Sequence, residues 1–173
     1  MVLIPTQNYY YMKVNIDQQT SKKARIPHNI FMLNIALVHL LMTPAVIALE
    51  IGALAMLVPL LISLAIMLHA YLSGTYSQTS THWFIIAHWK LAIKRYKLLL
   101  ISYLITAGLI AIGWLLAMAS PDPNMREILH TVFIRIAIMP VLIMVMINFY
   151  LESSAINMAL KGEIPDSLVE AHL

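Results

Sequence analysis

The 173-residue chain has no cysteine and little charge. The absence of cysteine excludes disulfides, iron–sulfur clusters and thiol catalysis. Asp, Glu, Lys and Arg make up only 11% of the residues, whereas a soluble domain of this length usually has about a quarter. Catalytic signatures are also missing from the sequence, which has no P-loop, no HExxH and no nucleophile elbow. We therefore do not expect this chain to be an enzyme by itself.

Long hydrophobic runs make up most of the chain, since 61% of its residues are hydrophobic. Each run has about 20 residues, which as a helix is enough to cross a hydrocarbon core of about 30 Å. The sequence predicts an all-α integral membrane protein in which two helical hairpins supply four transmembrane helices. The predicted spans are residues 30–49, 51–72, 98–119 and 128–150.

Polar segments flank this membrane domain of residues 30–150. Residues 1–29 form a predicted N-terminal arm and residues 151–173 a predicted C-terminal tail. Pro27 marks a boundary before the first helix, and Asn29 is a residue type that often caps a helix N-terminus. We therefore expect the first helix to begin close to residue 30.

The basic residues are distributed unevenly between the two sides of the predicted domain. Nine Lys and Arg residues lie on the side that holds both terminal segments, whereas Arg126 alone lies on the other. Cytoplasmic loops of membrane proteins carry an excess of Lys and Arg. The sequence therefore predicts a multi-pass protein of the bacterial inner membrane with both termini in the cytoplasm.

The stretch THWFIIAHWKLAIKRYK, residues 81–97, contains two His-Trp pairs followed by four cations. His82 and His88 are six residues apart and point about 120° away from each other on an α-helix, so they are not a same-face chelating pair. Cations on both flanks of an apolar, aromatic face are typical of a helix at a membrane surface. No Gly or Pro intervenes before Gly108, so the helix can run directly into the third span. We predict an interfacial amphipathic helix over 82–97, anchored in lipid by Trp83, Trp89, Lys90, Lys94, Arg95 and Lys97.

Histidines inside the predicted spans are candidates for cofactor binding. A haem b with two axial histidines needs them on different helices at similar depth. If the first hairpin turns near residue 51, His39 and His69 differ in depth by about 10 Å, which does not match that geometry. A quinone head group bordered by histidine and tryptophan stays open as an alternative. The candidate cofactor-binding residues are His39, His69, His82, His88 and Trp89.

Arg135 is the most costly residue inside the predicted spans, because a guanidinium in hydrocarbon must reach the surface or find a partner. Glu50, at the turn of the first hairpin, lies on the same side of the membrane. One prediction is therefore a Glu50–Arg135 ion pair. Snorkelling towards the surface and a carboxylate on a partner subunit are the two alternatives.

These features predict a non-catalytic accessory subunit of a larger inner-membrane complex, with an energy-transducing electron-transfer complex as its host. A quinone- or haem b-associated membrane anchor is one alternative, and a small transporter or channel that uses His39 is another. The expected partners are other membrane subunits and lipid. No metal site is predicted, and the basic residues border spans rather than forming a nucleic-acid-binding surface.

Overall fold

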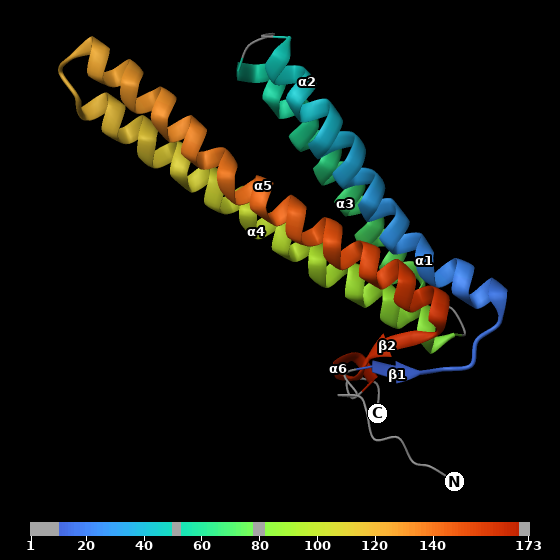
Figure 1. The fold of residues 1–173 in the computed structure, drawn as a ribbon. Coiled ribbons are helices and arrows are strands. Elements are labelled where there is room, and N and C mark those ends of the chain that lie inside the picture. The colour runs from blue at the N-terminus through green and yellow to red at the C-terminus, as the bar shows by residue number, and fades with distance from the viewer. Residues whose placement is uncertain (1–10, 50–52, 78–81, 170–173) are drawn as a thin grey trace. The chain divides into compact units, whose positions relative to one another are not determined.

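The computed structural model describes residues 11–49, 53–77 and 82–169, and most of these residues are helical (Figure 1). Within these ranges, four helices are long and apolar enough to cross a membrane. This confirms the prediction of an all-α, multi-pass membrane protein. The four helical segments are Gln18–Ala48, Leu57–Tyr76, Trp83–Ala119 and Pro123–Lys161.

The first of these segments begins earlier than the sequence predicts. Its N-terminal part, α1 (Gln18–Leu33), starts after Asp17, whose side chain accepts a hydrogen bond from the Thr20 backbone N–H at 2.9 Å. Hydrogen bonds from Thr20 also hold the pKa of Asp17 below its ordinary value. The predicted start near Asn29 was wrong, because Pro27 lies inside the helix and is buried there.

The same segment changes its winding near its middle. Asn34–Met42 form a π-helix, η1, and Thr43–Ala48 form α2. At the end of η1 both the backbone N–H and the Oγ1 of Thr43 donate to the carbonyl of Val38, five residues back. Pro44 follows and has no N–H to donate. The hydrogen-bond ladder is therefore already shifted by one residue where the proline enters the helix.

The first hairpin is completed by η2 (Ala53–Met56), a 3₁₀ turn, and by α3 (Leu57–Ser77), which contacts α1 and η1. The predicted second span began at residue 51, whereas the α-helix begins at Leu57. The turn that contains Glu50 lies outside the described residues.

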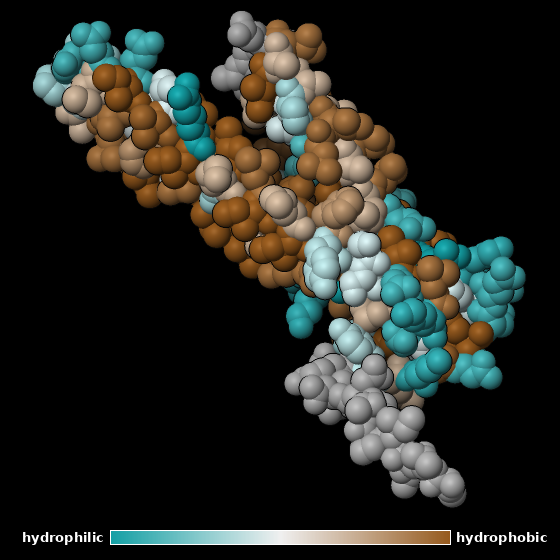
Figure 2. All heavy atoms as spheres, viewed as in Figure 1, coloured by the Kyte–Doolittle hydropathy of each residue, from teal (hydrophilic) through white to brown (hydrophobic). Residues whose placement is uncertain are grey.

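The second hairpin consists of α4 (Trp83–Ala119) and α5 (Pro123–Lys161). α4 has 37 residues and is continuous, which corresponds to a length of about 55 Å. The predicted interfacial helix is therefore not a separate element but the first part of α4, because no helix-breaking residue precedes the apolar run. Figure 2 shows that the middle part of these helices has a mostly hydrophobic surface.

The chain divides into two compact units. One contains the described residues up to Ile93 together with those from Glu152 onward, and the other is Lys94–Leu151. In the first unit, β1 (Tyr11–Lys13) pairs antiparallel with β2 (Glu163–Pro165), which α6 (Asp166–Val169) follows. This pairing fixes the N-terminal arm to the C-terminal tail.

The backbone position of Gly162, between α5 and β2, has no room for a side chain. Its φ is +70°, its carbonyl accepts a hydrogen bond from the Val14 N–H at 2.7 Å, and an added Cβ would overlap the Val14 carbonyl oxygen. Gly162→Ala is expected to cost about 2 kcal/mol of unfolding free energy through left-handed backbone strain and this overlap. Thermal unfolding measures the loss, with Lys161→Ala, at an exposed neighbouring position, as the control. Equal stability of the two variants would contradict the prediction.

Candidate functional site

A hydrogen-bonded chain of three ionisable side chains lies inside the first unit. His28 of α1, His88 of α4 and Glu152 of α5 are each 0% exposed. His28 Nδ1 lies 2.6 Å from Glu152 Oε2, and His28 Nε2 lies 2.9 Å from His88 Nδ1. His28 is therefore the central member of the chain and uses both of its ring nitrogens.

Close packing of α1 against α5 brings His28 to Glu152. Ala24 on α1 and Ala155 and Ala159 on α5 are fully buried, and such small side chains let helix backbones approach. Ser21 Oγ also donates to the Ala159 carbonyl at 2.9 Å. The sequence therefore places small or hydroxyl-bearing residues where these two helices meet.

Aromatic and apolar groups surround the three hydrogen-bonded side chains on the side of α4. The Phe84 ring is fully buried and its centroid lies 4.6 Å from that of His88. The rings of His28 and His88 are edge-to-face, with centroids 5.2 Å apart. Burial of this kind strengthens hydrogen bonds and makes a net charge in the cluster costly.

A second polar cluster lies in the first hairpin of the same unit. Asn34 Nδ2 donates to Ser63 Oγ at 3.0 Å, and His39 Nε2 lies 3.3 Å from the same oxygen. Residues five apart point about 140° away from each other on an α-helix, but only about 50° apart on a π-helix with about 4.4 residues per turn. The π winding of η1 therefore places Asn34 and His39 on the face that meets Ser63 of α3.

The second unit, Lys94–Leu151, has its own polar contacts. Arg95 Nη1 donates to the Leu151 carbonyl and Thr106 Oγ1 to the Ala137 carbonyl, both at 2.7 Å. These two hydrogen bonds fix the alignment of α4 against α5. Arg135, in contrast, is exposed on α5.

The candidate cofactor residues do not come together in one place. His39 belongs to the Asn34–Ser63 cluster, His69 is exposed on α3, and His82 is half-buried. His88 is buried in the His28–Glu152 chain, and its neighbour Trp89 is 6% exposed. The structure therefore does not assemble these five side chains into a single haem or quinone site.

The predicted lipid anchors also separate into groups. Lys94 and Lys97 are exposed, whereas Trp83 and Lys90 are half-buried. Trp89 and Arg95 are buried, at 6% and 7% exposed. The role of the six residues as lipid anchors stays a prediction. The predicted Glu50–Arg135 pair involves a residue outside the described ranges.

Sequence reasoning missed His28 and Glu152 because both lie outside the predicted spans. His28 precedes the predicted start of the first span, and Glu152 follows the predicted end of the fourth. Their helices continue past the apolar runs, so both side chains become part of helix contacts. The Asp17 cap and the absence of a helix-breaking residue between Pro140 and Gly162 are signals that could have extended both helices.

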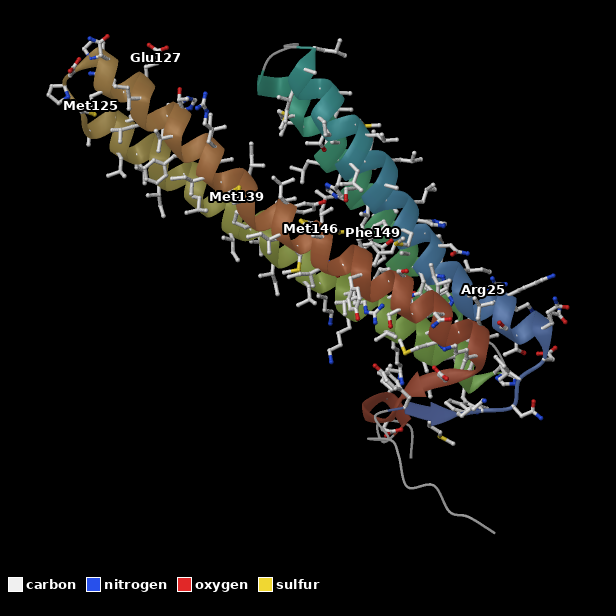
Figure 3. All side chains as sticks on the ribbon, in the orientation of Figure 1. Arg25, Met125, Glu127, Met139, Met146 and Phe149 are labelled. Atoms are coloured by element: carbon white, nitrogen blue, oxygen red, sulfur yellow. The ribbon has the colours of Figure 1, made fainter. Side chains whose placement is uncertain are left out.

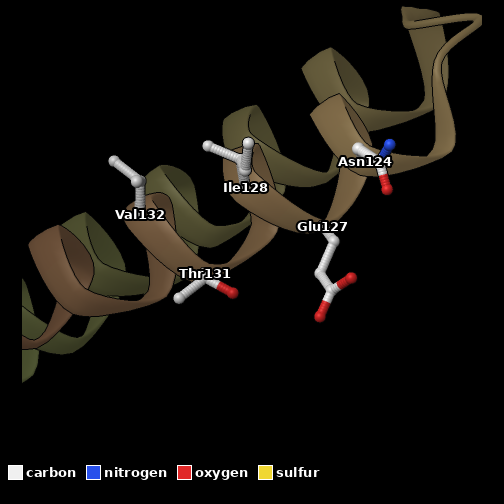
Figure 4. A pocket seen from close by; sticks show the side chains of 5 residues that line it. All are labelled: Asn124, Glu127, Ile128, Thr131 and Val132. Carbon is white, nitrogen blue, oxygen red and sulfur yellow. The ribbon is translucent and has the colours of Figure 1, made fainter.

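Other parts of the described chain offer weaker candidate sites. Among the described residues, no group of three or more His, Asp or Glu side chains has the arrangement of a metal site. A groove beside the α4–α5 turn is lined by Asn124, Glu127, Ile128, Thr131 and Val132 (Figure 4). All five side chains are exposed, so the groove is an open surface feature and not an enclosed binding site.

The buried Glu152–His28–His88 cluster and the exposed Arg135 are thus the two features with the clearest chemical consequences. The first can hold and share protons, because its groups are all titratable. The second can bind an anionic group. Comparisons with protein-family models, with curated proteins and with solved structures find no match for the chain.

Proposed function

We propose that this protein is a non-catalytic accessory subunit of a larger membrane complex. The observation that supports the proposal is the position of Arg135 in the α4–α5 hairpin, where an exposed guanidinium lies among membrane-spanning apolar residues. A charge at such a depth is costly unless another group satisfies it.

The alignment of α4 with α5 gives the depth of Arg135. Thr106 contacts Ala137, and Gly113 lies against Phe133. By interpolation Arg135 lies level with about Leu109 and Ile110. These residues are at the middle of the uncharged run of α4 between Lys97 and Asp122. Arg135 is therefore close to the centre of the apolar band of this hairpin.

No carboxylate of the hairpin lies at that depth. The only acidic residues in Lys94–Leu151, all of which the structure describes, are Asp122 and Glu127, at and just after the turn. Glu127 precedes Arg135 by two turns, or about 12 Å. Snorkelling covers only part of a half-bilayer of about 15 Å. A carboxylate or carbonyl of a neighbouring subunit would satisfy the guanidinium directly.

The surface of α4 at the same level is suited to close contact with another helix. Gly108 is exposed, and a Cβ added there would meet no atom within 4 Å. Open space next to a glycine allows a second helix backbone to approach closely. The large exposed side chains nearby, such as Leu104 at 65% exposed, would then be covered by lipid and by the partner.

Replacement of Arg135 tests this proposal. Arg135→Leu is expected to lower the amount of co-purified membrane partner about tenfold or more, because the partner's anionic group loses its charge-assisted hydrogen bond. Affinity purification from native membranes followed by native gel electrophoresis measures the ratio of partner to protein. Arg126→Leu removes an arginine near the turn and serves as the matched control.

The outcomes separate the alternatives. Undiminished partner binding by Arg135→Leu would overturn the proposal and favour snorkelling. If Glu50→Gln reproduces the loss of stability of Arg135→Leu while partner binding is retained, the intrachain ion pair is favoured instead.

The proposal also includes the membrane in which the protein lies and the kind of complex to which it belongs. The excess of basic residues on one side supports a bacterial inner membrane with both termini in the cytoplasm. Within that membrane we propose an energy-transducing electron-transfer complex as the host. Protease protection of a site introduced after Asp122 in sealed vesicles of known orientation tests the topology, and cleavage from the cytoplasmic side would contradict it.

A further inference from the structure

We propose that Glu152, His28 and His88 form a proton-binding and proton-transfer site in which a proton is shared between Glu152 and His88 through His28. The inference goes beyond the proposed accessory role, because it concerns chemistry inside one chain and does not depend on Arg135. It rests on two consecutive hydrogen bonds, of 2.6 and 2.9 Å, among three fully buried groups.

The hydrogen-bonding capacities of the groups restrict where the protons lie. Each of the two hydrogen bonds needs one proton, and a neutral imidazole can donate through only one nitrogen. In an apolar site the favoured arrangements have no net charge. One such arrangement is a protonated Glu152 with two neutral histidines. In the others Glu152 is a carboxylate, and either His28 or His88 is the imidazolium.

These neutral arrangements differ only by proton shifts along existing hydrogen bonds. In the first step, the carboxylic proton of Glu152 moves to His28 Nδ1, which produces a carboxylate and an imidazolium. In the second step, the proton on His28 Nε2 moves to His88 Nδ1, so that His28 becomes neutral and His88 carries the positive charge. No heavy atom has to move, no bond other than N–H or O–H changes, and the total charge stays constant.

The surrounding charges are cationic on two of the three helices. Arg25 lies one turn before His28 on α1 (Figure 3), and Lys90 lies two residues after His88 on α4. On α3, His69 is exposed.

The three hydrogen-bonded side chains also connect helices from distant parts of the sequence, because His28, His88 and Glu152 lie on α1, α4 and α5. They lie towards the basic ends of those helices, which is the predicted cytoplasmic side. A proton-transfer site at this place would load or release protons at one end of the membrane-spanning segments. The ligand of this site is therefore the proton.

Spectroscopy of the full chain in nanodiscs tests the proposal. Nitrogen-15 NMR of labelled histidine reports the protonation of each ring nitrogen, and infrared spectroscopy with labelled glutamate reports whether Glu152 is a carboxylic acid. In the unmodified protein we expect averaged signals from His28 Nδ1 and Nε2, which indicate shared protons. Signals of one fixed arrangement, unchanged over a range of pH and temperature, would overturn the proposal without any variant.

A variant adds a second readout. In His88→Asn the amide replaces the Nδ1 position but cannot accept a proton to form a cation. Glu152 is linked to His88 through His28. We therefore expect the infrared signal of Glu152 to change in this variant, because the two groups share a proton through His28. Phe84→Leu alters the packing on His88 and leaves all three titratable groups in place, so it should leave that signal unchanged. A Glu152 signal that is the same in His88→Asn and in the unmodified protein would also overturn the proposal.

Discussion

Replacing His28 by leucine is expected to lower the free energy of unfolding by about 3–5 kcal/mol, the largest stability effect of any single substitution considered for this protein. The substitution removes both hydrogen bonds of His28, to Glu152 and to His88, at once. It leaves the fully buried Glu152 carboxyl group without its hydrogen bond to His28. The loss therefore reflects buried polar groups that have each lost a hydrogen bond, more than the net value of the His28–Glu152 pair itself.

A double replacement separates these two contributions. His28→Leu combined with Glu152→Met removes both hydrogen-bonded groups together and keeps a similar side-chain volume. It is expected to recover most of the lost stability, because apolar replacements of a buried pair are often neutral. His69→Leu, at an exposed histidine of α3, is the matched control and should change stability by about 0.5 kcal/mol or less. Reversible unfolding in mixed micelles provides the measurement, and a double variant no more stable than His28→Leu would contradict this account.

The four membrane-spanning helices could be predicted from the sequence because their signal is one of composition. An apolar run of about 20 residues suffices to identify a span, and it does not depend on which residues the helix contacts. The ends of the helices depend on local interactions that composition does not describe. At the start of α1, the Asp17–Thr20 hydrogen bond outweighs the boundary that Pro27 suggests.

The polar sites could not be predicted because each depends on a feature that an ideal helical wheel omits. Asn34 and His39 share a face only because η1 is a π-helix. His28 and Glu152 meet although 124 positions separate them in the sequence. The pairing of β1 with β2 has the same character, since each strand has three residues and its partner lies near the other end of the chain. Contacts of this kind are set by tertiary packing and leave little trace in local sequence patterns.

The second large effect is expected at Gly113, where α4 and α5 are in close contact. A Cβ added at Gly113 would overlap the Cβ of Phe133 and lie 2.5 Å from its Cγ. Since Phe133 Cβ is fixed to the backbone of α5, rotation of the ring cannot relieve the overlap, and the two helices must move apart. Gly113→Ala is therefore expected to cost about 2–3 kcal/mol, and the shift also strains the Thr106–Ala137 hydrogen bond on the same interface.

Gly108 provides a matched control on the same helix. A Cβ at Gly108 meets no atom within 4 Å, so Gly108→Ala is expected to be neutral or to stabilise the protein by up to about 1 kcal/mol through the better helix propensity of alanine. Unfolding of the isolated chain in micelles should thus separate the two substitutions by about 3 kcal/mol. If Gly108→Ala keeps the stability of the isolated chain but weakens its binding to the co-purified partner, the open space at Gly108 is the place where the partner's helix packs, at the same depth as Arg135. Equal stability of the Gly113 and Gly108 variants would mean that α4 and α5 do not approach each other closely at Phe133.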